Sequence, residues 1–269
     1  MASQRTSEFF ETHPVFTHAE YLASRMTRGR SRQTANNLLA RYLATGRLIR
    51  IRRGLYATVP VGVDPTRASV DPYLVISRLT PDSIVAYHAA LQFFGQAHSL
   101  WRRFHYLTRG RARPVRFRDL EFVPVQLPAA IRERRDLGGG ITDARHMGSR
   151  LRVTTLERTL VDVMDAPDKG GGWEEIWRSL EAVEFFDLDL VVECALALDS
   201  SVTAARVGFF LEEHREALMA EDRHLEKLRA RAPSEPRYLD AERRPGRLVS
   251  PWNLIVPKAV LDRQWEETA

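Results

Sequence analysis

The stretch SRQTANNLLARYLATGRLIRIRRGLYATV, residues 31–59, predicts an α-helix followed by a β-hairpin. Its apolar residues recur at the i, i+3, i+4 spacing of one helical face, and Gly46 then provides a stop. That face comprises Ala35, Leu38, Leu39, Tyr42 and Leu43. After the stop, apolar residues alternate with arginines over residues 49–52, and a second alternating run covers residues 55–59. Arg53-Gly54 lies between the two runs as the hairpin turn.

A second helix is predicted directly upstream of this stretch. Thr17 and Glu20 form a capping box of the T-x-x-E type, and the helix they open ends near Met26. Its apolar stripe is predicted to consist of Ala19, Leu22 and Ala23. A short first helix around Phe9 and Phe10 completes the order helix, helix, turn, helix, hairpin. This is the order of a winged helix-turn-helix, a common DNA-binding unit.

The polar face of the 31–45 helix suggests DNA reading. Gln33 and Asn37 are one turn apart, and such amides pair with adenine, whereas arginine pairs with guanine. The alternative is a solvated face, but solvated faces usually mix both signs of charge, and residues 21–63 contain no acid at all. The predicted DNA-binding residues are Arg30, Arg32, Gln33, Asn36, Asn37, Arg41, Arg50, Arg52 and Arg53.

The charge of the 269-residue chain is distributed unevenly. Residues 1–60 carry ten arginines against three glutamates, a net charge of +7. Residues 99–153 carry thirteen arginines against five acids, a net of +8, whereas residues 154–269 carry fifteen bases against twenty-four acids, a net of −9. A small, strongly basic N-terminal unit is typical of nucleic-acid binders. The acidic last part is expected to meet protein or solvent.

The chain is predicted to divide into a DNA-binding domain at residues 1–60, a linker at 61–70 and a larger domain at 71–269. In the larger domain we expect helices at residues 72–79, 83–96, 155–165, 173–184, 188–198, 202–217 and 221–231. Strands are expected within residues 103–108, 115–128, 140–154 and 247–257, and a loop at residues 167–172. The 155–165 helix is assigned a capping box formed by Thr154 and Glu157. The predicted class is α+β and mostly helical.

The segment at residues 170–190 has features of an enzyme active site. Residues 170–190, GGGWEEIWRSLEAVEFFDLDL, resemble the start of a polymerase-β-type nucleotidyltransferase, with Asp187 and Asp189 as metal ligands. The residues that follow recur at helical spacing, so a Gly-rich loop and a helix capped by Asp187 are favoured. The chain has no Glu-x-Lys of restriction-type nucleases and no phosphate-binding Gly-Lys-Ser/Thr. We therefore expect no catalytic residues, no metal site and no cofactor.

Several other residues receive a structural interpretation. His88 is predicted to be a core histidine, and His98 and His105 surface groups. The aromatic residues of the acidic part favour a core over a partner surface: Trp173, Trp177, Phe185, Phe186, Phe209 and Phe210. A single cysteine, Cys194, and the lack of a signal-like or membrane-spanning apolar run predict a cytoplasmic protein that does not enter a membrane.

Three segments carry a family resemblance. RRGLYAT at residues 52–58, DPYLVISRLTPDSIVAYHAAL at 71–91 and RVTTLERTLVDVMDAPDKGGGWEEIWRSLE at 152–181 resemble the AbiEi antitoxins, and the likeness extends over nearly the whole chain. The resemblance implies the antitoxin of a type IV, AbiE toxin–antitoxin system that provides abortive infection against phage. Its winged helix represses the operon by binding inverted repeats of operator DNA. Its second domain counters a nucleotidyltransferase-like toxin, without requiring a stable complex.

Three hypotheses follow from the sequence. The first is an antitoxin that represses its own operon. The second is a stand-alone winged-helix transcriptional regulator whose second domain binds a ligand or dimerises. The third is an enzyme acting on nucleic acid or on the toxin, which would require metal-dependent turnover through Asp187 and Asp189.

Overall fold

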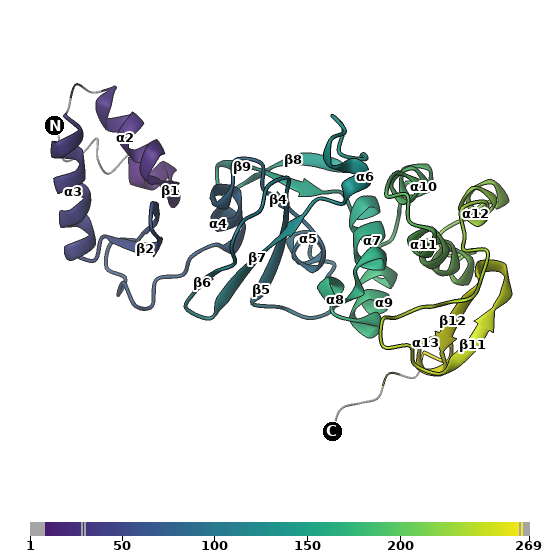
Figure 1. The fold of residues 1–269 in the computed structure, drawn as a ribbon. Helices are drawn as coiled ribbons and strands as arrows, with labels where there is room; N and C mark the ends of the chain where they lie inside the picture. Colours follow the sequence, from purple (N-terminus) through teal and green to yellow (C-terminus); the bar gives the residue numbers. More distant parts are fainter. Residues whose placement is uncertain (1–8, 28, 30, 264, 266–269) are drawn as a thin grey trace.

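The N-terminal part combines helices with a three-stranded antiparallel sheet. The computed structural model describes residues 9–27, 29, 31–263 and 265 (Figure 1). The elements are β1 (Val15–Thr17), α2 (His18–Met26), α3 (Arg32–Ala44), β2 (Leu48–Arg52) and β3 (Leu55–Thr58). Residues 9–12 are also helical, and the sheet order is β1-β3-β2. The predicted order of helices and hairpin is thus present, and β1 is a further strand that was not predicted.

The ends of these helices are set by local side chains. The Thr17 side chain accepts a hydrogen bond from the Glu20 amide, and the Glu20 carboxylate accepts one from the Thr17 amide at 2.7 Å. The Ser31 hydroxyl caps α3 by accepting from the Thr34 amide at 3.2 Å. Gly46 has a φ of +70°, a left-handed conformation that favours glycine. The predicted caps and the helix stop are confirmed.

The predicted apolar stripe of α2 is wrong for two of its three residues. Leu22 packs against the N-terminal core as predicted, but Ala19 and Ala23 are exposed, and the buried side chains of α2 are Tyr21 and Arg25. Tyr21 packs in an aromatic cluster with Phe9, Phe10 and Phe16. A large ring buries far more apolar area than an alanine, so the orientation of the helix follows the tyrosine.

The second part is built on a six-stranded mixed sheet with the order β6-β7-β5-β4-β9-β8. Its strands are β4 (Ile84–Val85), β5 (Arg103–Thr108), β6 (Val115–Phe117), β7 (Leu120–Gln126), β8 (Ile141–His146) and β9 (Ser149–Thr154). The pairs β5–β7 and β4–β9 are parallel and the other neighbours are antiparallel. The strands expected within residues 140–154 are confirmed as β8 and β9, which pair as an antiparallel hairpin.

One prediction in this sheet is wrong and another is refined. The predicted helix at residues 83–96 is a strand, β4, followed by the shorter helix α5 (His88–Phe93). Ile84 and Val85 form a short apolar run between β5 and β9, and such a run does not distinguish a buried strand from a helix. The strand conformation expected within residues 115–128 is confirmed, and it is divided into β6 and β7 because the chain turns at Arg118, which has a φ of +55°.

Helices cover the sheet and fill the C-terminal part of the fold. They are α4 (Pro72–Leu79), α6 (Ala129–Arg132), α7 (Leu156–Asp165), α8 (Pro167–Gly170), α9 (Trp173–Glu181), α10 (Leu188–Ala197), α11 (Ser201–Glu213), α12 (Asp222–Arg229) and α13 (Lys258–Leu261). Helices α7 to α12 lie on the opposite side of the sheet from the N-terminal unit (Figure 1). The α+β class is confirmed, and the predicted helices α4, α7 and α9 to α12 are present.

Three details of this part differ from the predictions. The predicted 167–172 loop contains the short helix α8, whose proline at the first position favours a helical start. The predicted 247–257 strand is β11 (Gly246–Val249), a 3-10 turn η1 (Ser250–Trp252) and β12 (Leu254–Pro257), paired with β10 (Arg237–Tyr238). Helix α7 is capped by Thr155, which accepts from the Arg158 amide.

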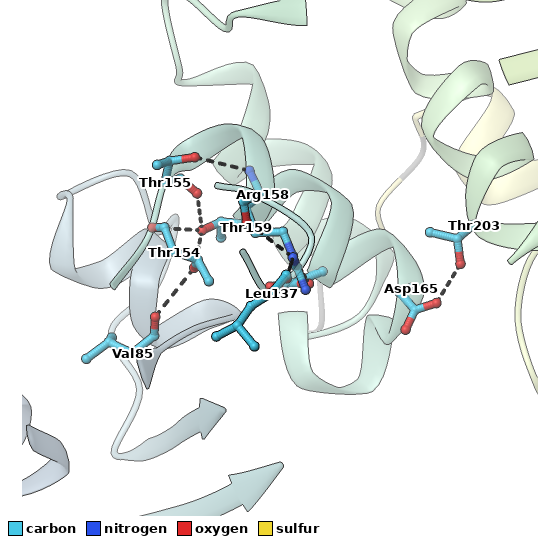
Figure 2. A network of polar contacts seen from close by, with 10 residues as sticks. Val85, Leu137, Thr154, Thr155, Arg158, Thr159, Asp165 and Thr203 are labelled. Atoms are coloured by element: carbon cyan, nitrogen blue, oxygen red, sulfur yellow. Dashed lines mark hydrogen bonds and ion pairs between the residues drawn. The ribbon is translucent and has the colours of Figure 1, made fainter. Parts of the chain in front are cut away.

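The residue assigned as the α7 cap, Thr154, belongs instead to a buried network. Its hydroxyl lies 2.8 Å from that of Thr159 and 3.4 Å from the Val85 carbonyl oxygen (Figure 2). Because its partners are Val85 of β4 and Thr159 of α7, the Thr154 side chain lies between the sheet and α7. Two adjacent threonines offer two possible capping positions, and only the tertiary contacts distinguish them.

The C-terminal aromatic residues form a core, as predicted, with one exception. Trp173, Trp177, Phe209 and Phe210 are buried together with Phe186 in one large cluster. Phe185 differs, because 67% of its surface is exposed.

The N-terminal unit and the second part share a hydrophobic cluster. Val15, Ile51 and Leu55 of the N-terminal sheet pack with residues of α4 such as Val75, and with the six-stranded sheet. An ion pair of 2.8 Å between Arg78 Nε and Glu20 Oε1 adds a polar contact across the same junction. The junction is therefore a packed interface, and the 61–70 segment runs alongside it.

One of the two histidines of the sheet region is more buried than predicted. His88 is fully buried, as predicted, with Nε2 2.9 Å from Glu175 Oε1 and its ring stacked on Trp101. His105, predicted to be at the surface, is only 6% exposed because it lies on the central strand β5 beside the ring of Tyr87. Burial, helped by the nearby Lys169 charge, lowers the pKa of His105 to about 4.

This pKa predicts a loss of stability in mild acid. The pKa of His105 is about 6.5 when the chain is unfolded and about 4 when it is folded, so between these values only the unfolded state gains the proton. Stability contributed by neutral His105 is therefore present above pH 6.5 and is lost as the pH falls towards 4. The loss amounts to about 3 kcal/mol at most.

Urea unfolding followed by circular dichroism at several pH values measures this effect. His105→Phe, which cannot take up a proton, is expected to flatten the pH dependence between 6.5 and 4. A His98→Phe control at an exposed histidine should keep the wild-type dependence. An unchanged slope in His105→Phe would show that other groups control the acid transition.

Candidate nucleic-acid interface

The outer face of α3 gathers most of the predicted DNA-binding side chains. Arg32, Gln33, Asn37 and Arg41 are all exposed, and the opposite face of the helix buries Ala35 and Leu39. Gln33 Nε2 donates a hydrogen bond to Asn37 Oδ1 at 3.1 Å, so the two amides lie side by side one turn apart. Helix α3 lies at the far end of the molecule from α11 and α12 (Figure 1). This face is open to a large ligand.

Asn36 differs from the other predicted residues because it contacts the preceding helix. It is half-buried, and its Oδ1 lies 2.9 Å from His18 Nε2 at the start of α2. This contact links α2 to α3. Arg30 was also predicted to bind DNA, but it lies outside the described residues.

The hairpin arginines divide into two groups. Arg50 and Arg52 on β2 and Arg53 in the turn are all exposed. Arg52 differs in that its guanidinium donates from Nη2 to the carbonyl oxygen of Leu79 at 2.8 Å, across the junction with α4. Sequence patterns do not reveal this hydrogen bond, because the acceptor is a main-chain oxygen 27 residues away.

A further basic loop was not among the predicted residues. Arg111 and Arg113 are exposed on the segment between β5 and β6. Arg113 and Arg52 line one small pocket of about 260 Å³, so this loop adjoins the hairpin. The high arginine content of residues 99–153 was visible in the sequence, but the proximity of this loop to the hairpin depends on the pairing of the sheet.

The charge balance of α3 favours an anionic partner. Helix α3 contains no acidic residue, and the Glu20 carboxylate on α2 is occupied by Arg78 and by the Thr17 cap. Positive side chains without nearby carboxylates raise the local potential and attract phosphate. Exposed amides beside arginines add donors and acceptors suited to base edges.

The enzymatic candidate does not form a metal site. Asp187 caps α10 by accepting from the Leu190 amide at 3.1 Å, as the favoured interpretation predicted. Asp189 accepts two hydrogen bonds from Arg223, at 2.7 and 2.8 Å. No cluster of three or more His, Cys, Asp or Glu side chains that could hold a metal ion is present among the described residues, which are 9–27, 29, 31–263 and 265.

Within the part of the chain that the structure describes, no helix is both long and apolar enough to span a membrane.

Comparisons with known proteins identify the fold. No family model and no curated protein matches the chain. Among solved structures, the crystal structure of the RV2827C protein from Mycobacterium tuberculosis superposes with a TM-score of 0.60 at 19% identity, covering 97% of this chain and 94% of that one. The chain therefore shares the overall fold of that protein over almost its entire length.

Proposed function

We propose that the protein is a DNA-binding transcriptional repressor that reads its operator with the outer face of α3. The observation that carries the proposal is the acid-free, exposed group of Arg32, Gln33, Asn37 and Arg41. Side chains of these types match base edges and phosphates. In a winged helix-turn-helix, α3 is the helix that enters the major groove and the hairpin is the wing.

We further propose that the chain is an antitoxin of the AbiE type. The support is the resemblance of residues 52–58, 71–91 and 152–181 to the AbiEi family, together with the strongly acidic charge of residues 154–269. Because like charges repel, an acidic part of the chain is poorly suited to DNA and is available for a protein partner. The proposed partner is a nucleotidyltransferase-like toxin encoded beside this gene, and neutralising it requires no enzymatic activity of this chain.

The amides of α3 are expected to determine sequence preference. In a Gln33→Ala/Asn37→Ala double variant, the removal of each amide should cost about 1–3 kcal/mol of operator affinity. Affinity for scrambled DNA should change little, because the interactions with phosphate remain. Fluorescence anisotropy on the DNA upstream of the gene measures both affinities. A Gln126→Ala variant, which alters an exposed amide on β7, is the control and should bind as wild type.

Co-expression with the neighbouring gene tests the antitoxin proposal. The full-length chain is expected to restore growth of cells that express the toxin. An Arg32→Glu/Arg41→Glu variant, which is designed to abolish DNA binding, should restore growth equally well because α3 lies far from the acidic helices (Figure 1). If the full-length chain gives no protection while operator binding is intact, the protein is a stand-alone regulator.

A further inference from the structure

A loop of the second part carries two unpaired arginines. The loop is the segment 109–114, RGRARP, which connects β5 to β6, and both Arg111 and Arg113 are exposed on it. Neither guanidinium makes an ion pair or a hydrogen bond with another part of the chain that the structure describes. The other arginines of residues 99–118 are all held by carboxylates or by main-chain oxygens: Arg102, Arg103, Arg109, Arg116 and Arg118.

No acidic residue lies within this part of the sequence. Residues 83–118 contain neither Asp nor Glu. The carboxylate before them, that of Asp82, already accepts from the Thr108 hydroxyl at 2.7 Å and from the Arg109 amide at 2.6 Å, at the base of the loop. Because a guanidinium is always charged, Arg111 and Arg113 present two positive charges to an external anionic partner.

The loop lies next to the hairpin of the N-terminal unit. Strand β6, which follows the loop, is in contact with β2 (Figure 1). A small pocket between them is lined by Arg52, Leu79, Tyr106, Ala112, Arg113 and Val115, so its lining contains no carboxylate. Arg52 is held there by its hydrogen bond to the Leu79 carbonyl oxygen, and Arg53 follows it in the exposed turn. The basic surface of the hairpin therefore continues onto the second part.

The backbone of double-stranded DNA fits the spacing of these charges. Arg111 and Arg113 are two residues apart, so their Cα atoms are separated by at most about 7 Å. A DNA strand carries one phosphate for every ~3.4 Å of helix axis, so two such arginines can contact neighbouring phosphates of one strand. Exposed arginines without internal partners are suited to this contact, because they lose no ion pair when they bind.

We propose that the 109–114 loop binds the sugar–phosphate backbone of DNA beside the hairpin, through Arg111 and Arg113. The inference rests on the proposed DNA binding by α3, and it adds a contact outside the winged helix-turn-helix. The hydrophobic cluster shared by the two parts holds the loop next to the hairpin. Contacts to phosphate carry no sequence information, so the loop contributes affinity and α3 contributes the sequence preference.

The test is an Arg111→Ser/Arg113→Ser variant of the full-length protein. Anisotropy titrations at several salt concentrations compare the upstream DNA with a scrambled duplex. The variant should bind both duplexes about tenfold more weakly, the scale of two exposed ion pairs, with an unchanged ratio of the two affinities. The slope of log affinity against log salt should become shallower by about two. Arg111→Lys/Arg113→Lys should keep the wild-type slope, because both charges remain.

The matched control is Arg237→Ser/Arg247→Ser, which removes the same charge. These exposed arginines lie on β10 and β11, in the C-terminal sheet at the far end of the molecule from α3 (Figure 1). The control should bind DNA with wild-type affinity and slope. Circular dichroism and thermal unfolding establish that each variant is folded.

The outcomes separate this proposal from that of DNA reading by α3. Wild-type affinity and slope in the folded Arg111→Ser/Arg113→Ser variant, or an equal loss in the control, would overturn the loop proposal alone. Equal affinity of the wild-type protein for the two duplexes would contradict sequence reading by α3, while the loop would still be tested by its effect on the salt slope. A wild-type protein that binds neither duplex would overturn both.

Discussion

Replacing Asp162 by alanine is expected to lower the free energy of unfolding by about 3–5 kcal/mol. The Asp162 carboxylate lies 2.7 Å from Arg158 Nε on the next turn of α7, and both side chains are buried, with 2% and 0% of their surface exposed. Breaking a buried ion pair from one side leaves a charge without compensation in a medium that solvates it poorly. The alanine variant would leave the Arg158 guanidinium in that state.

The same arginine also organises a loop. Arg158 Nη1 donates to the carbonyl oxygen of Leu137 at 3.0 Å, in the segment that leads into β8 (Figure 2). Gly140, with a φ of +62°, lies so close to Arg158 that an added Cβ would collide with the arginine Cβ. The ion pair therefore stabilises the packing of α7 and the path of the chain into the sheet.

A double variant distinguishes two contributions to the free energy of unfolding: the loss of the ion pair itself and the cost of leaving one buried charge without a partner. Arg158→Met/Asp162→Leu removes both charges and retains apolar volume, so it should be more stable than Asp162→Ala alone. Urea unfolding of the three proteins measures the difference. A destabilisation of less than about 1 kcal/mol in Asp162→Ala would contradict the account, because it would mean that the guanidinium reaches water or another partner.

Reversing two charges on α3 is expected to reduce operator affinity roughly a thousandfold, since each of the two arginines contributes about 2 kcal/mol to binding. The variant is Arg32→Glu/Arg41→Glu, at two exposed positions of the helix. Carboxylates at these places would repel phosphate as well as remove donors. The slope of the logarithm of affinity against the logarithm of salt concentration should become shallower by about one for each phosphate that the variant no longer neutralises.

Anisotropy titrations at several salt concentrations measure affinity and slope together. The matched control is Arg178→Glu/Arg215→Glu, a double reversal at exposed arginines of α9 and of the segment after α11, which should bind the operator as wild type. If the α3 variant and the control are weakened to the same extent, the effect is one of net charge and α3 is not the reading helix.

The helices were predictable because their signals are local. Three helix starts are marked by N-cap residues whose side chains accept a hydrogen bond from a nearby amide: Thr17, Ser31 and Asp187. The spacing of apolar residues predicts the buried face of α3. Short buried strands carry no such signal. β4 is a two-residue strand in which Val85 pairs with Tyr106, 21 residues away, and with Val153, 68 residues away. Its conformation is determined by neighbours that the local sequence does not reveal.

The candidate interface, like the fold, was predictable only where its signals are local. The exposed positions of α3 follow from helical periodicity, so Gln33, Asn37 and Arg41 were assigned to the outer face correctly. Arg52 follows the buried Ile51, so strand alternation predicts an outward side chain. Its guanidinium nevertheless donates a hydrogen bond to the carbonyl oxygen of Leu79. Periodicity predicts the face on which a side chain lies, but an interaction between two parts of the chain depends on their packing.

The measurement that tests the central proposal most directly is the affinity of the wild-type protein for the DNA upstream of its own gene. Anisotropy titrations compare that DNA with a scrambled duplex of equal length and composition at one fixed salt concentration. The account predicts at least about a thousandfold tighter binding to the upstream DNA, the usual margin of specific over non-specific recognition. Equal affinity for the two duplexes, or no binding to either, would contradict it.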